Sequence, residues 1–339
     1  YAIAKSDLLL QGQGDQADHI GFGSTLSNDQ FPTYQFDFML SNPPYGKSWK
    51  VDADKLGGKK DIMDSRFVTN FADDPNFSMI PRTSDGQLLF LLNNVAKMKK
   101  TTELGSRIAE VHNGSSLFTG DAGQGESNAR RYMIENDLVE AIIALPENMF
   151  YNTGIGTFIW ILSNNKAEHR KGKIQLIDAT SLKSPLRKNL GKKNCEFTSE
   201  IRRQILDLYM AFEENEYSKI FDNNEFGYWK VTVLRPAYNE DGTIQRDKKG
   251  KPVVNKELTD TEQIPFTYEG GIEAFFEKEV KPFAPDAWID EKQTKIGYEI
   301  SFTKYFYKPI QLRTLEEITA DIRSLEEETD GLLAEIIGG

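Results

Sequence analysis

Residues that build disulfides and metal centres are scarce in this sequence. Its 339 residues contain a single cysteine and three scattered histidines: Cys195, His19, His112 and His169. One cysteine excludes an internal disulfide, and scattered histidines lack metal-ligand spacing, so we expect no metal site and a reducing, cytoplasmic location. No apolar run is long enough to span a bilayer, and residues 1–11 do not have the pattern of a signal peptide. Because the sequence begins with Tyr1 rather than Met, we expect a segment to be missing upstream.

Acidic residues outnumber basic ones, but unevenly along the chain. The net charge is −11, and residues 311–339 contribute −6 of it through eight acids and two bases, leaving −5 for the other 310 residues. Residues 181–194 contain no acid and five bases: Lys183, Arg187, Lys188, Lys192 and Lys193. Such a stretch suits contact with phosphates, although a basic loop can equally well be only solvated, and the sequence leaves both open.

The tetrapeptide Asn42-Pro43-Pro44-Tyr45 directly follows a mostly apolar run, residues 36–41. Successive prolines restrict φ and disfavour helix at the preceding residue, so this backbone is rigid. The Asn42 carboxamide oxygen and the Pro43 carbonyl, held side by side, can accept both N–H bonds of a planar amino group. Such a group has a delocalised lone pair and needs acceptors more than a base, and fixed dipoles supply this electrostatic form of catalysis.

Tyr45 adds an aromatic ring to these acceptors. Stacking on an extruded base contributes about 1–3 kcal/mol, which offsets part of the cost of flipping that base out of a duplex. Ligands of open α/β sheets also bind beyond the carboxyl ends of strands. The tetrapeptide therefore predicts methyl transfer to a planar amino or amide nitrogen, and the alternative is a strand that simply ends in a Pro-Pro turn.

Hydrophobic periodicity predicts an α/β fold with helices on the faces of a sheet. The expected elements are buried strands at 36–40, 107–112, 139–145, 157–163 and 173–178, and helices at 88–100 and 128–137. The link from 145 to 157 has no helical period, so its two strands are expected to form an antiparallel hairpin at the sheet edge. Residues 1–182 would form this domain.

The sequence becomes more charged beyond residue 182. Residues 200–214 predict a charged helix. A second hairpin is expected from strands at 228–235 and 252–255, joined through polar turn residues. We expect residues 183–310 to form this α+β extension.

A heptad pattern occupies the last segment, residues 311–339. Apolar residues follow the spacing 3, 4, 3, 4, 3, 4, with Thr329 in the one gap: Leu315, Ile318, Ile322, Leu325, Leu332 and Ile336. This seam predicts a coiled-coil helix that binds a partner helix, and the alternative is packing on its own domain.

Several segments together resemble the modification (M) subunit of type I restriction-modification enzymes, which are N6-adenine DNA methyltransferases. The segments are residues 36–46, 113–118, 129–131, 145–154 and 295–300, and the resemblance covers nearly all of the chain. It implies a Rossmann-like sheet that uses S-adenosylmethionine, here N-terminally incomplete. It also implies double-stranded DNA as substrate, a specificity (S) subunit held through the C-terminal helix, a second M subunit and a restriction (R) subunit. A more basic partner sharing the DNA would reconcile that binding with the acidic charge.

The resemblance also implies roles for individual residues. Asn42 and Pro43 would hold the adenine amino group and Tyr45 would stack on the ring. Phe150 would lie against the flipped base, and Arg130 or Arg131 would reach a phosphate. Each has an alternative: an aromatic residue beside a hairpin commonly covers a core edge, and paired arginines in the first turns of a helix are usually solvated.

The sequence departs from the family on the cofactor side. The glycine-rich loop and the acidic residue that holds the ribose are not found before Asn42, and the glycine pairs at 12–14 and 21–23 are interpreted as turns. The family often has Asp before a Thr-Leu pair, whereas here Ser24 precedes Thr25 and Leu26. By this comparison Ser24 and Leu26 would contact the cofactor, and we expect the chain alone to bind it weakly or not at all.

Two further hypotheses remain open from the sequence. The tetrapeptide also suits a protein glutamine N5-methyltransferase, because a glutamine side chain offers the same planar nitrogen. A small protein-modifying enzyme would have no need of the long segment after residue 182 or of the heptad helix. The other hypothesis is an assembly module that retains half of a catalytic site.

Overall fold

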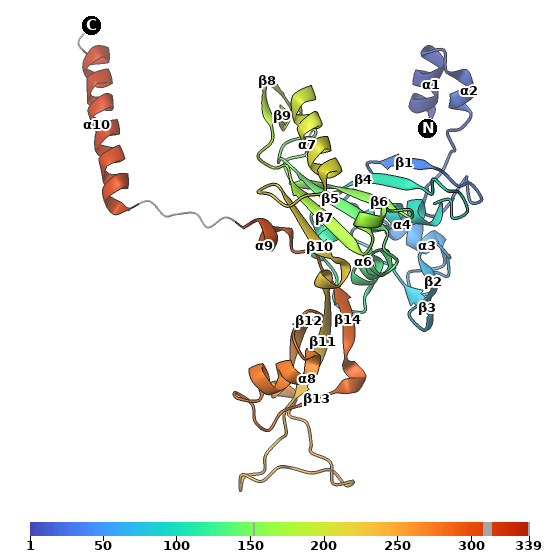
Figure 1. The fold of residues 1–339 in the computed structure, drawn as a ribbon, viewed down its shortest axis with the longest axis vertical. Helices are drawn as coiled ribbons and strands as arrows, with labels where there is room; N and C mark the ends of the chain where they lie inside the picture. The colour runs from blue at the N-terminus through green and yellow to red at the C-terminus, as the bar shows by residue number, and fades with distance from the viewer. Residues whose placement is uncertain (152, 308–313, 338–339) are drawn as a thin grey trace. The chain divides into compact units, whose positions relative to one another are not determined.

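The chain folds into two compact units, Tyr1–Phe302 and Thr303–Gly339. The computed structural model describes residues 1–151, 153–307 and 314–337, and beyond residue 325 it describes only the side chain of Thr329. The first unit contains nearly all residues predicted for the catalytic domain and its extension. Figure 1 shows the course of the chain.

A six-stranded sheet forms the centre of the first unit. In spatial order its strands are β1 (Phe38–Ser41), β4 (Arg107–Asn113), β6 (Thr157–Ser163), β5 (Val139–Leu145), β7 (Lys173–Asp178) and β10 (Ser218–Asp222). β1 pairs parallel with β4, and β5 pairs parallel with β7. β6 runs antiparallel to β4 and β5, and β10 runs antiparallel to β7. The predicted α/β class is confirmed, with β1, β4, β5 and β7 running in one direction.

Helices cover both faces of this sheet. On one face α4 (Gln87–Ala96) contacts β4, and its Asn94 side chain donates a hydrogen bond to Glu110. On the other face α7 (Ser199–Ala211) contacts β7, and Ile205 packs with Ile143 and Ile177. The predicted helices at 88–100, 128–137 and 200–214 are confirmed as α4, α6 (Gly125–Glu135) and α7. The remaining helices of this region are α1 (Ala2–Leu10), α2 (Gly14–Ala17), α3 (Lys50–Lys55) and α5 (Ser115–Phe118).

Strand β1 differs from its prediction. Met39 is buried, but Phe38 is 65% and Leu40 86% exposed. β1 lies at one edge of the sheet. On the face that carries Phe38 and Leu40, α7 packs over β5 and β7. The prediction of a fully buried strand was wrong, because apolar residues on both faces indicate burial only where both faces are covered.

The hairpin of β5 and β6 also differs in one respect. The two strands pair antiparallel, as predicted, with Ile142 opposite Trp160. They lie inside the sheet and not at its edge, because β6 also pairs with β4 and β5 with β7. All seven residues of β5 are buried, which fits an interior strand better than an edge strand.

A smaller sheet follows in the chain. β11 (Gly227–Leu234) pairs antiparallel with β12 (Asp260–Pro265), β13 (Trp288–Ile289) and β14 (Lys295–Tyr298). The helix α8 (Gly271–Phe275) runs into a π-helical turn, Phe276–Val280, whose Phe276 packs on this sheet with Val231 and Ile264. Two further strand pairs are β2 (Val68–Phe71) with β3 (Asp74–Ser78), and β8 (Ser184–Leu190) with β9 (Lys193–Glu196).

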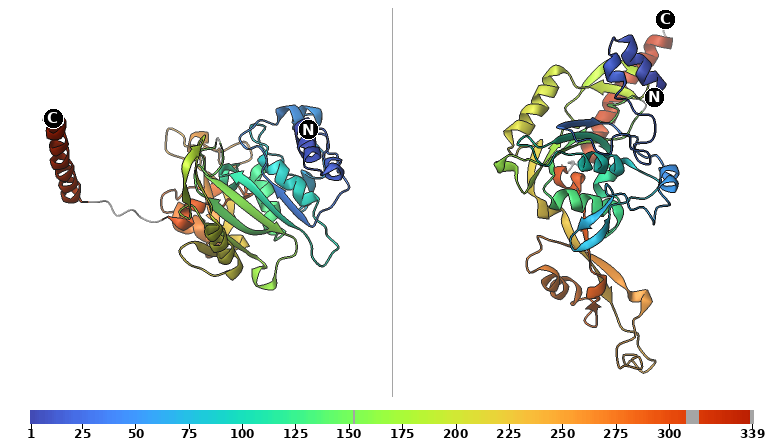
Figure 2. Two further views of the ribbon diagram at one scale, coloured as in Figure 1. Left: turned by 90° about the horizontal axis from the view of Figure 1, so that it is seen from above. Right: turned by 90° about the vertical axis from the view of Figure 1, so that its right-hand side faces the viewer.

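The second predicted hairpin had the wrong second strand. β11 pairs with β12, whereas residues 252–255 belong to an arm, residues 235–259, that isolated bridges such as Pro236 with Val254 hold together. The arm extends away from the main sheet, as Figures 1 and 2 show. Polar turn residues at 240–242 and 248–250 suggested a simple hairpin, but they belong to successive turns of this arm.

The second unit contains α9 (Phe302–Phe306), which begins at the boundary, and α10 (Leu315–Ile337). α10 confirms the predicted terminal helix, whereas residues 311–313 and the side chains of Leu332 and Ile336 lie outside what the structure describes. Four residues of the heptad seam are 41–82% exposed: Leu315, Ile318, Ile322 and Leu325. No helix within the described ranges is long and apolar enough to cross a membrane.

Gly125 begins α6 directly against the backbone of Ile80. A Cβ atom at Gly125 would lie 1.9 Å from the Ile80 carbonyl oxygen. Backbone atoms cannot rotate aside, so Gly125→Ala is expected to lower the free energy of unfolding by about 1–3 kcal/mol or more. Urea denaturation measures this change. Gly156→Ala is the matched control, because a Cβ at Gly156 meets nothing within 4 Å, and equal stability of the two variants would contradict the prediction.

Candidate functional site

The carboxyl ends of four strands lie at one end of the main sheet, which we call its carboxyl edge. Because β1, β4, β5 and β7 run in the same direction, Ser41, Asn113, Leu145 and Asp178 end their strands at this edge. The segments that follow the first three are residues 42–45, 114–118 and 146–150. Three segments singled out in the sequence are therefore brought to the same edge, where ligands of open α/β sheets bind.

The predicted catalytic segment is an exposed loop with a buried anchor. Asn42 is exposed and its side chain makes no hydrogen bond to any residue that the structure describes, while Pro43 is buried, Pro44 exposed and Tyr45 half-buried. Trp49 is only 4% exposed; its indole N–H donates to the Arg82 carbonyl at 2.9 Å, and its backbone N–H donates to the Thr83 carbonyl at 3.0 Å. β1 and Trp49 thus hold the loop at both ends, and the Asn42 carboxamide remains available.

We expect Trp49→Phe to loosen this loop without unfolding the chain. Phenylalanine retains most of the apolar packing but leaves the Arg82 carbonyl without its indole donor, and a hydrogen bond of this kind contributes about 0.5–1.5 kcal/mol. Hydrogen exchange of amides 45–49 should accelerate, together with a matching fall in the free energy of unfolding. Unchanged exchange in the variant would contradict the anchoring role.

A polar cluster adjoins this edge and was not predicted from the sequence. The Gln87 side-chain amide donates to Asp85 at 2.7 Å, to Asn113 at 2.7 Å and to Ser115 at 2.8 Å. The Asn113 backbone N–H donates back to Gln87 at 3.0 Å. Gln87 is 2% exposed, so its hydrogen bonds fix the start of α4 against the end of β4. The signal that sequence reasoning passed over was a glutamine at the start of an otherwise apolar helix.

Phe150 lies at the same edge but packs inward. It is half-buried against the cluster that Ile143, Leu145 and Ile177 form beneath α7. Asn148, two residues earlier, has a positive φ of 58°. Contact of Phe150 with a flipped base stays a prediction, since the ring currently covers a core edge, as its alternative interpretation proposed.

The two arginines of α6 have different surroundings. Arg130 is 1% exposed; its Nε donates to the Tyr298 carbonyl at 2.7 Å and its Nη1 to the Ser116 carbonyl at 3.0 Å. Burial lowers the pKa of Arg130 to about 10. The prediction that Arg130 reaches a phosphate was wrong, because its guanidinium instead joins β14 to the main domain.

Arg131 pairs with Glu135 at 2.9 Å and lies over the ring of Phe77. Its side chain is 18% exposed. A phosphate contact by Arg131 stays a prediction, and it would require exchange of the Glu135 carboxylate for a phosphate oxygen.

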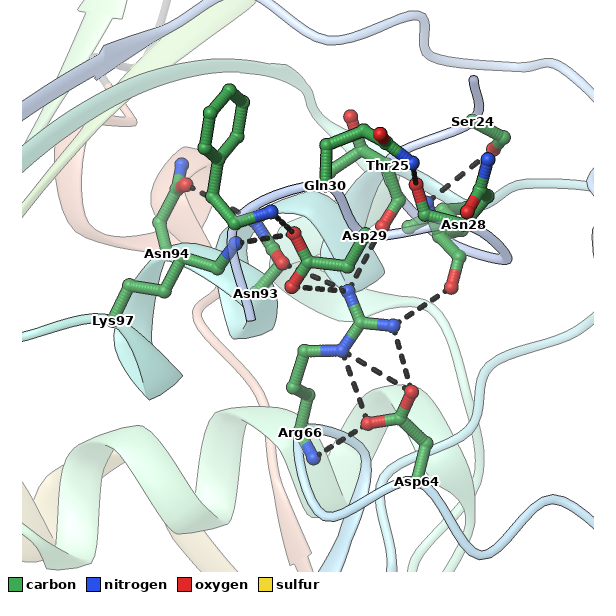
Figure 3. Close-up of polar contacts among 12 residues, drawn as sticks. Ser24, Thr25, Asn28, Asp29, Gln30, Asp64, Arg66, Asn93, Asn94 and Lys97 are labelled. Atoms are coloured by element: carbon green, nitrogen blue, oxygen red, sulfur yellow. Dashed lines mark hydrogen bonds and ion pairs between the residues drawn. The ribbon is translucent and has the colours of Figure 1, made fainter. Parts of the chain in front are cut away.

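The predicted cofactor-side loop, residues 24–31, is fastened by a network of charges (Figure 3). The Arg66 guanidinium donates to the carbonyls of Thr25 and Leu26, each at 2.8 Å, and to the Asp64 carboxylate at 2.7 Å. Asp29 lies 2.7 Å from the Lys97 ammonium. Leu26 is 1% exposed, and the Ser24 hydroxyl accepts from the backbone N–H of Leu26 at 3.3 Å. Ser24 and Leu26 therefore lie on a rigid loop, and their contact with a cofactor stays a prediction.

Burial and pairing act in opposite directions on the acids of this network. Burial raises the pKa of Asp29, but the hydrogen bonds from Lys97 and the Phe31 backbone N–H outweigh it, so the pKa lies below its ordinary value. The pKa of Asp64 is lowered in the same way, because hydrogen bonds from Arg66 outweigh its burial. Both carboxylates are thus charged at neutral pH: Asp29 ties the loop to Lys97, and Asp64 holds the Arg66 guanidinium that bonds to the loop.

Two hollows border these elements. One of about 210 Å³ lies beside the 24–31 loop, lined by Thr25, Asn28 and Asn93 among others. A larger one, of about 600 Å³, is lined by Met98, Leu138 and Asn164 among others. These residues lie at the opposite edge of the sheet, beyond the amino end of β5, so the larger hollow does not coincide with the predicted catalytic segment.

Two buried ionisable groups lie inside the sheet. His112 Nε2 is 2.7 Å from Glu110 Oε1, and both side chains are fully buried.

The described residues include no group of three or more histidine, cysteine, aspartate or glutamate side chains placed to hold a metal ion.

Known proteins match most of this chain. It is 29% identical over 242 residues to the type I restriction enzyme MjaIX methylase subunit of Methanocaldococcus jannaschii, covering 69% of this chain and 38% of that protein. It is 30% identical over 224 residues to the MjaVII methylase subunit of the same organism, covering 66% and 36%. A solved type I restriction-modification methyltransferase subunit from Streptococcus thermophilus matches with a TM-score of 0.50 and 25% identity, over 65% of this chain and 41% of that one.

The resemblance to type I modification subunits is confirmed by these relatives, of which the chain spans about two fifths of the length. The family model of N-6 DNA methylases matches residues 1–231, which is more than half of the chain. The chain belongs to the N-6 DNA methylase family.

Proposed function

We propose that this chain is the base-binding part of a type I modification subunit that methylates N6 of adenine in double-stranded DNA. The observation that carries the proposal is the loop after β1. Asn42 presents an exposed carboxamide at the carboxyl edge of the sheet, and the buried Pro43 and Trp49 fix its position. The Asn42 oxygen and the Pro43 carbonyl would accept the two amino N–H bonds of a flipped adenine, and Tyr45 would stack on its ring.

The residues of the 24–31 loop fit one end of S-adenosylmethionine. The adjoining hollow of about 210 Å³ is smaller than the roughly 300–1,000 Å³ of most ligand sites, so it suits part of that cofactor. Ser24 would offer its hydroxyl, and the buried Leu26 would support the loop from below. S-adenosylmethionine would supply the methyl group when bound. Asn42 would hold the amino nitrogen in place and turn its lone pair out of the ring plane.

The experiment that tests the function is a methyl-transfer assay with radiolabelled S-adenosylmethionine. The modification subunit of which this chain is proposed to form the base-binding part, combined with a specificity subunit, receives duplex DNA or a glutamine-containing protein as acceptor. We expect label in the DNA, identified as N6-methyladenine after nuclease digestion and mass spectrometry. Label on glutamine, or on neither acceptor, would refute the proposal.

The proposed assembly is the one named for type I enzymes. A specificity subunit would bind through α10, with a second modification subunit and a restriction subunit joining in the cytoplasm. The support lies in α10, whose seam residues Leu315 and Leu325 are 82% and 61% exposed. Such a seam gains stability by burial against another helix.

We expect deletion of residues 311–339 to weaken association with the specificity subunit. The deletion removes the apolar seam and a net charge of −6, while the first unit ends at Phe302 and stays intact. Gel filtration of the mixed subunits at several concentrations measures the change. Complex formation equal to that of the full chain would refute the role of α10.

A further inference from the structure

The hairpin of β8 and β9 is fixed to the edge of the main sheet that carries Asn42. Its attachment is the loop after β5: the Asn194 backbone N–H donates to the Asn148 carbonyl at 3.1 Å. The Lys193 ammonium donates to the Met149 carbonyl at 2.8 Å. The Cys195 thiol, 2% exposed, lies 3.4 Å from the Glu147 carbonyl oxygen. The hairpin is therefore held at the carboxyl edge and does not hang free from it.

The bases of this hairpin form a run without an acid, and Glu196, the last residue of β9, is the one acid of the hairpin. Residues 181–194 contain five bases and no acid, in a chain whose net charge is −11. Lys183, Arg187, Lys188 and Lys192 are exposed, and none of them forms an ion pair with a residue that the structure describes. Several bases elsewhere in the chain are paired, as Lys97 is with Asp29 and Lys166 with Asp137. Four unpaired bases together in an acidic chain favour a polyanion as their partner.

A second basic segment gives a comparison within the same chain. The arm carries exposed Arg246, Lys248, Lys249 and Lys251, but Asp247 lies among them and its carboxylate accepts from the backbone N–H groups of Lys249 and Lys251. The arm extends away from the main sheet, whereas β8 and β9 lie at the other end of the first unit in Figure 1. Of these two segments, only the hairpin combines a run of bases without an intervening acid with contacts to the loop that follows β5.

We propose that the β8–β9 hairpin binds the phosphate backbone of the DNA duplex from which the target base is flipped. The inference rests on the proposed function and adds to it the element that holds the duplex beside Asn42. An acidic protein segment, such as the outer face of α10 in another copy, would offer scattered carboxylates. A duplex offers a continuous row of phosphates along its length, which matches a hairpin whose exposed bases are spread from residue 183 to residue 192.

The test compares two variants from which the same charge is removed. The hairpin variant carries Lys183→Gln, Arg187→Gln, Lys188→Gln and Lys192→Gln; the arm variant carries Arg246→Gln, Lys248→Gln, Lys249→Gln and Lys251→Gln. Fluorescence anisotropy of a labelled duplex, titrated with the full chain over a series of salt concentrations, gives the affinity and its salt dependence. For every phosphate that a variant no longer neutralises, the slope of log K against log salt should become shallower by about 0.9.

We expect a slope smaller by about 2–4 for the hairpin variant, and a slope close to that of the wild type for the arm variant. Equal slopes in the hairpin variant and the wild type, or an equal fall in both variants, would overturn the proposal. A hairpin variant that keeps its duplex affinity but loses a self-association that the wild type shows in sedimentation would also overturn the proposal. That result would indicate an acidic protein partner. Failure of the proposed function is distinguishable, because the wild type itself would then bind no duplex.

Discussion

Asn42→Ala is expected to lower the rate of methyl transfer strongly while leaving the fold and the assembly intact. The carboxamide is the proposed acceptor for the adenine amino group, and removal of one fixed dipole of this kind lowers kcat about 10²–10³-fold. Since Asn42 is exposed and without a hydrogen-bond partner among the described residues, its replacement should change the free energy of unfolding by less than about 0.5 kcal/mol. Transfer of a radiolabelled methyl group to duplex DNA measures the rate, and urea denaturation measures the stability.

The matched control for this experiment is Asn76→Ala. Asn76 is also exposed, and it lies on β3, outside the segments that follow the strand ends of the main sheet. The control should methylate at the wild-type rate. Methyl transfer retained in Asn42→Ala would contradict the catalytic assignment. A large loss of stability in the same variant would show instead that Asn42 serves the fold.

The central strands were predictable because their composition reports their surroundings. Residues 139–145, 157–163 and 173–178 were expected as strands and form β5, β6 and β7 with the same bounds. They lie in the interior of the sheet, where both faces are covered and apolar residues run almost without interruption. β1 has the same composition at an edge, and its exposure depends on what covers the sheet, which the strand itself does not encode.

The arm was not predictable from local signals. Turn residues are as frequent within it as in a hairpin, and the strand that does pair with β11, β12, has the sequence DTEQIP, which is too polar to suggest a strand. β12 becomes a strand because β11 offers it a paired edge and Ile264 enters the core of the small sheet. Tertiary context thus decided this segment.

Within the candidate site, sequence reasoning proposed candidate residues but missed the contacts that support them. Asn42 and Tyr45 were recognised from a pattern of four consecutive residues, which is local information. The supports of Arg66 lie at residues 25, 26, 64 and 93, and no periodicity links these positions. Arg130 was misjudged for the same reason, since its partner Tyr298 is 168 residues away. Long-range polar contacts of this kind emerge only from the folded chain.

Arg66→Ala is expected to lower the free energy of unfolding by about 3–5 kcal/mol at neutral pH. The Arg66 side chain is 12% exposed, and its removal leaves Asp64 and two backbone carbonyls of the 24–31 loop without their donor. Breaking a largely buried charge pair from one side is costly because the remaining charge stays desolvated. Urea denaturation measures the loss, and hydrogen exchange of amides 24–29 should accelerate in parallel. Arg66→Lys is the matched control. It keeps the positive charge but not the planar guanidinium that bonds to several acceptors at once, so its loss of unfolding free energy should be smaller than that of Arg66→Ala.

The loss should also depend on pH in a defined direction. The pKa values of Asp29 and Asp64 are lowered in the folded state, so their pairing stabilises the fold above the unfolded pKa of about 3.9 and is lost as pH falls through the folded values. In Arg66→Ala the Asp64 share of this stabilisation is already absent. The difference between wild type and variant should therefore shrink in acid, below about pH 4. A difference that is constant from neutral to acidic pH would mean that Arg66 stabilises the loop by packing alone, and that its charge has no part in holding the residues on the cofactor side.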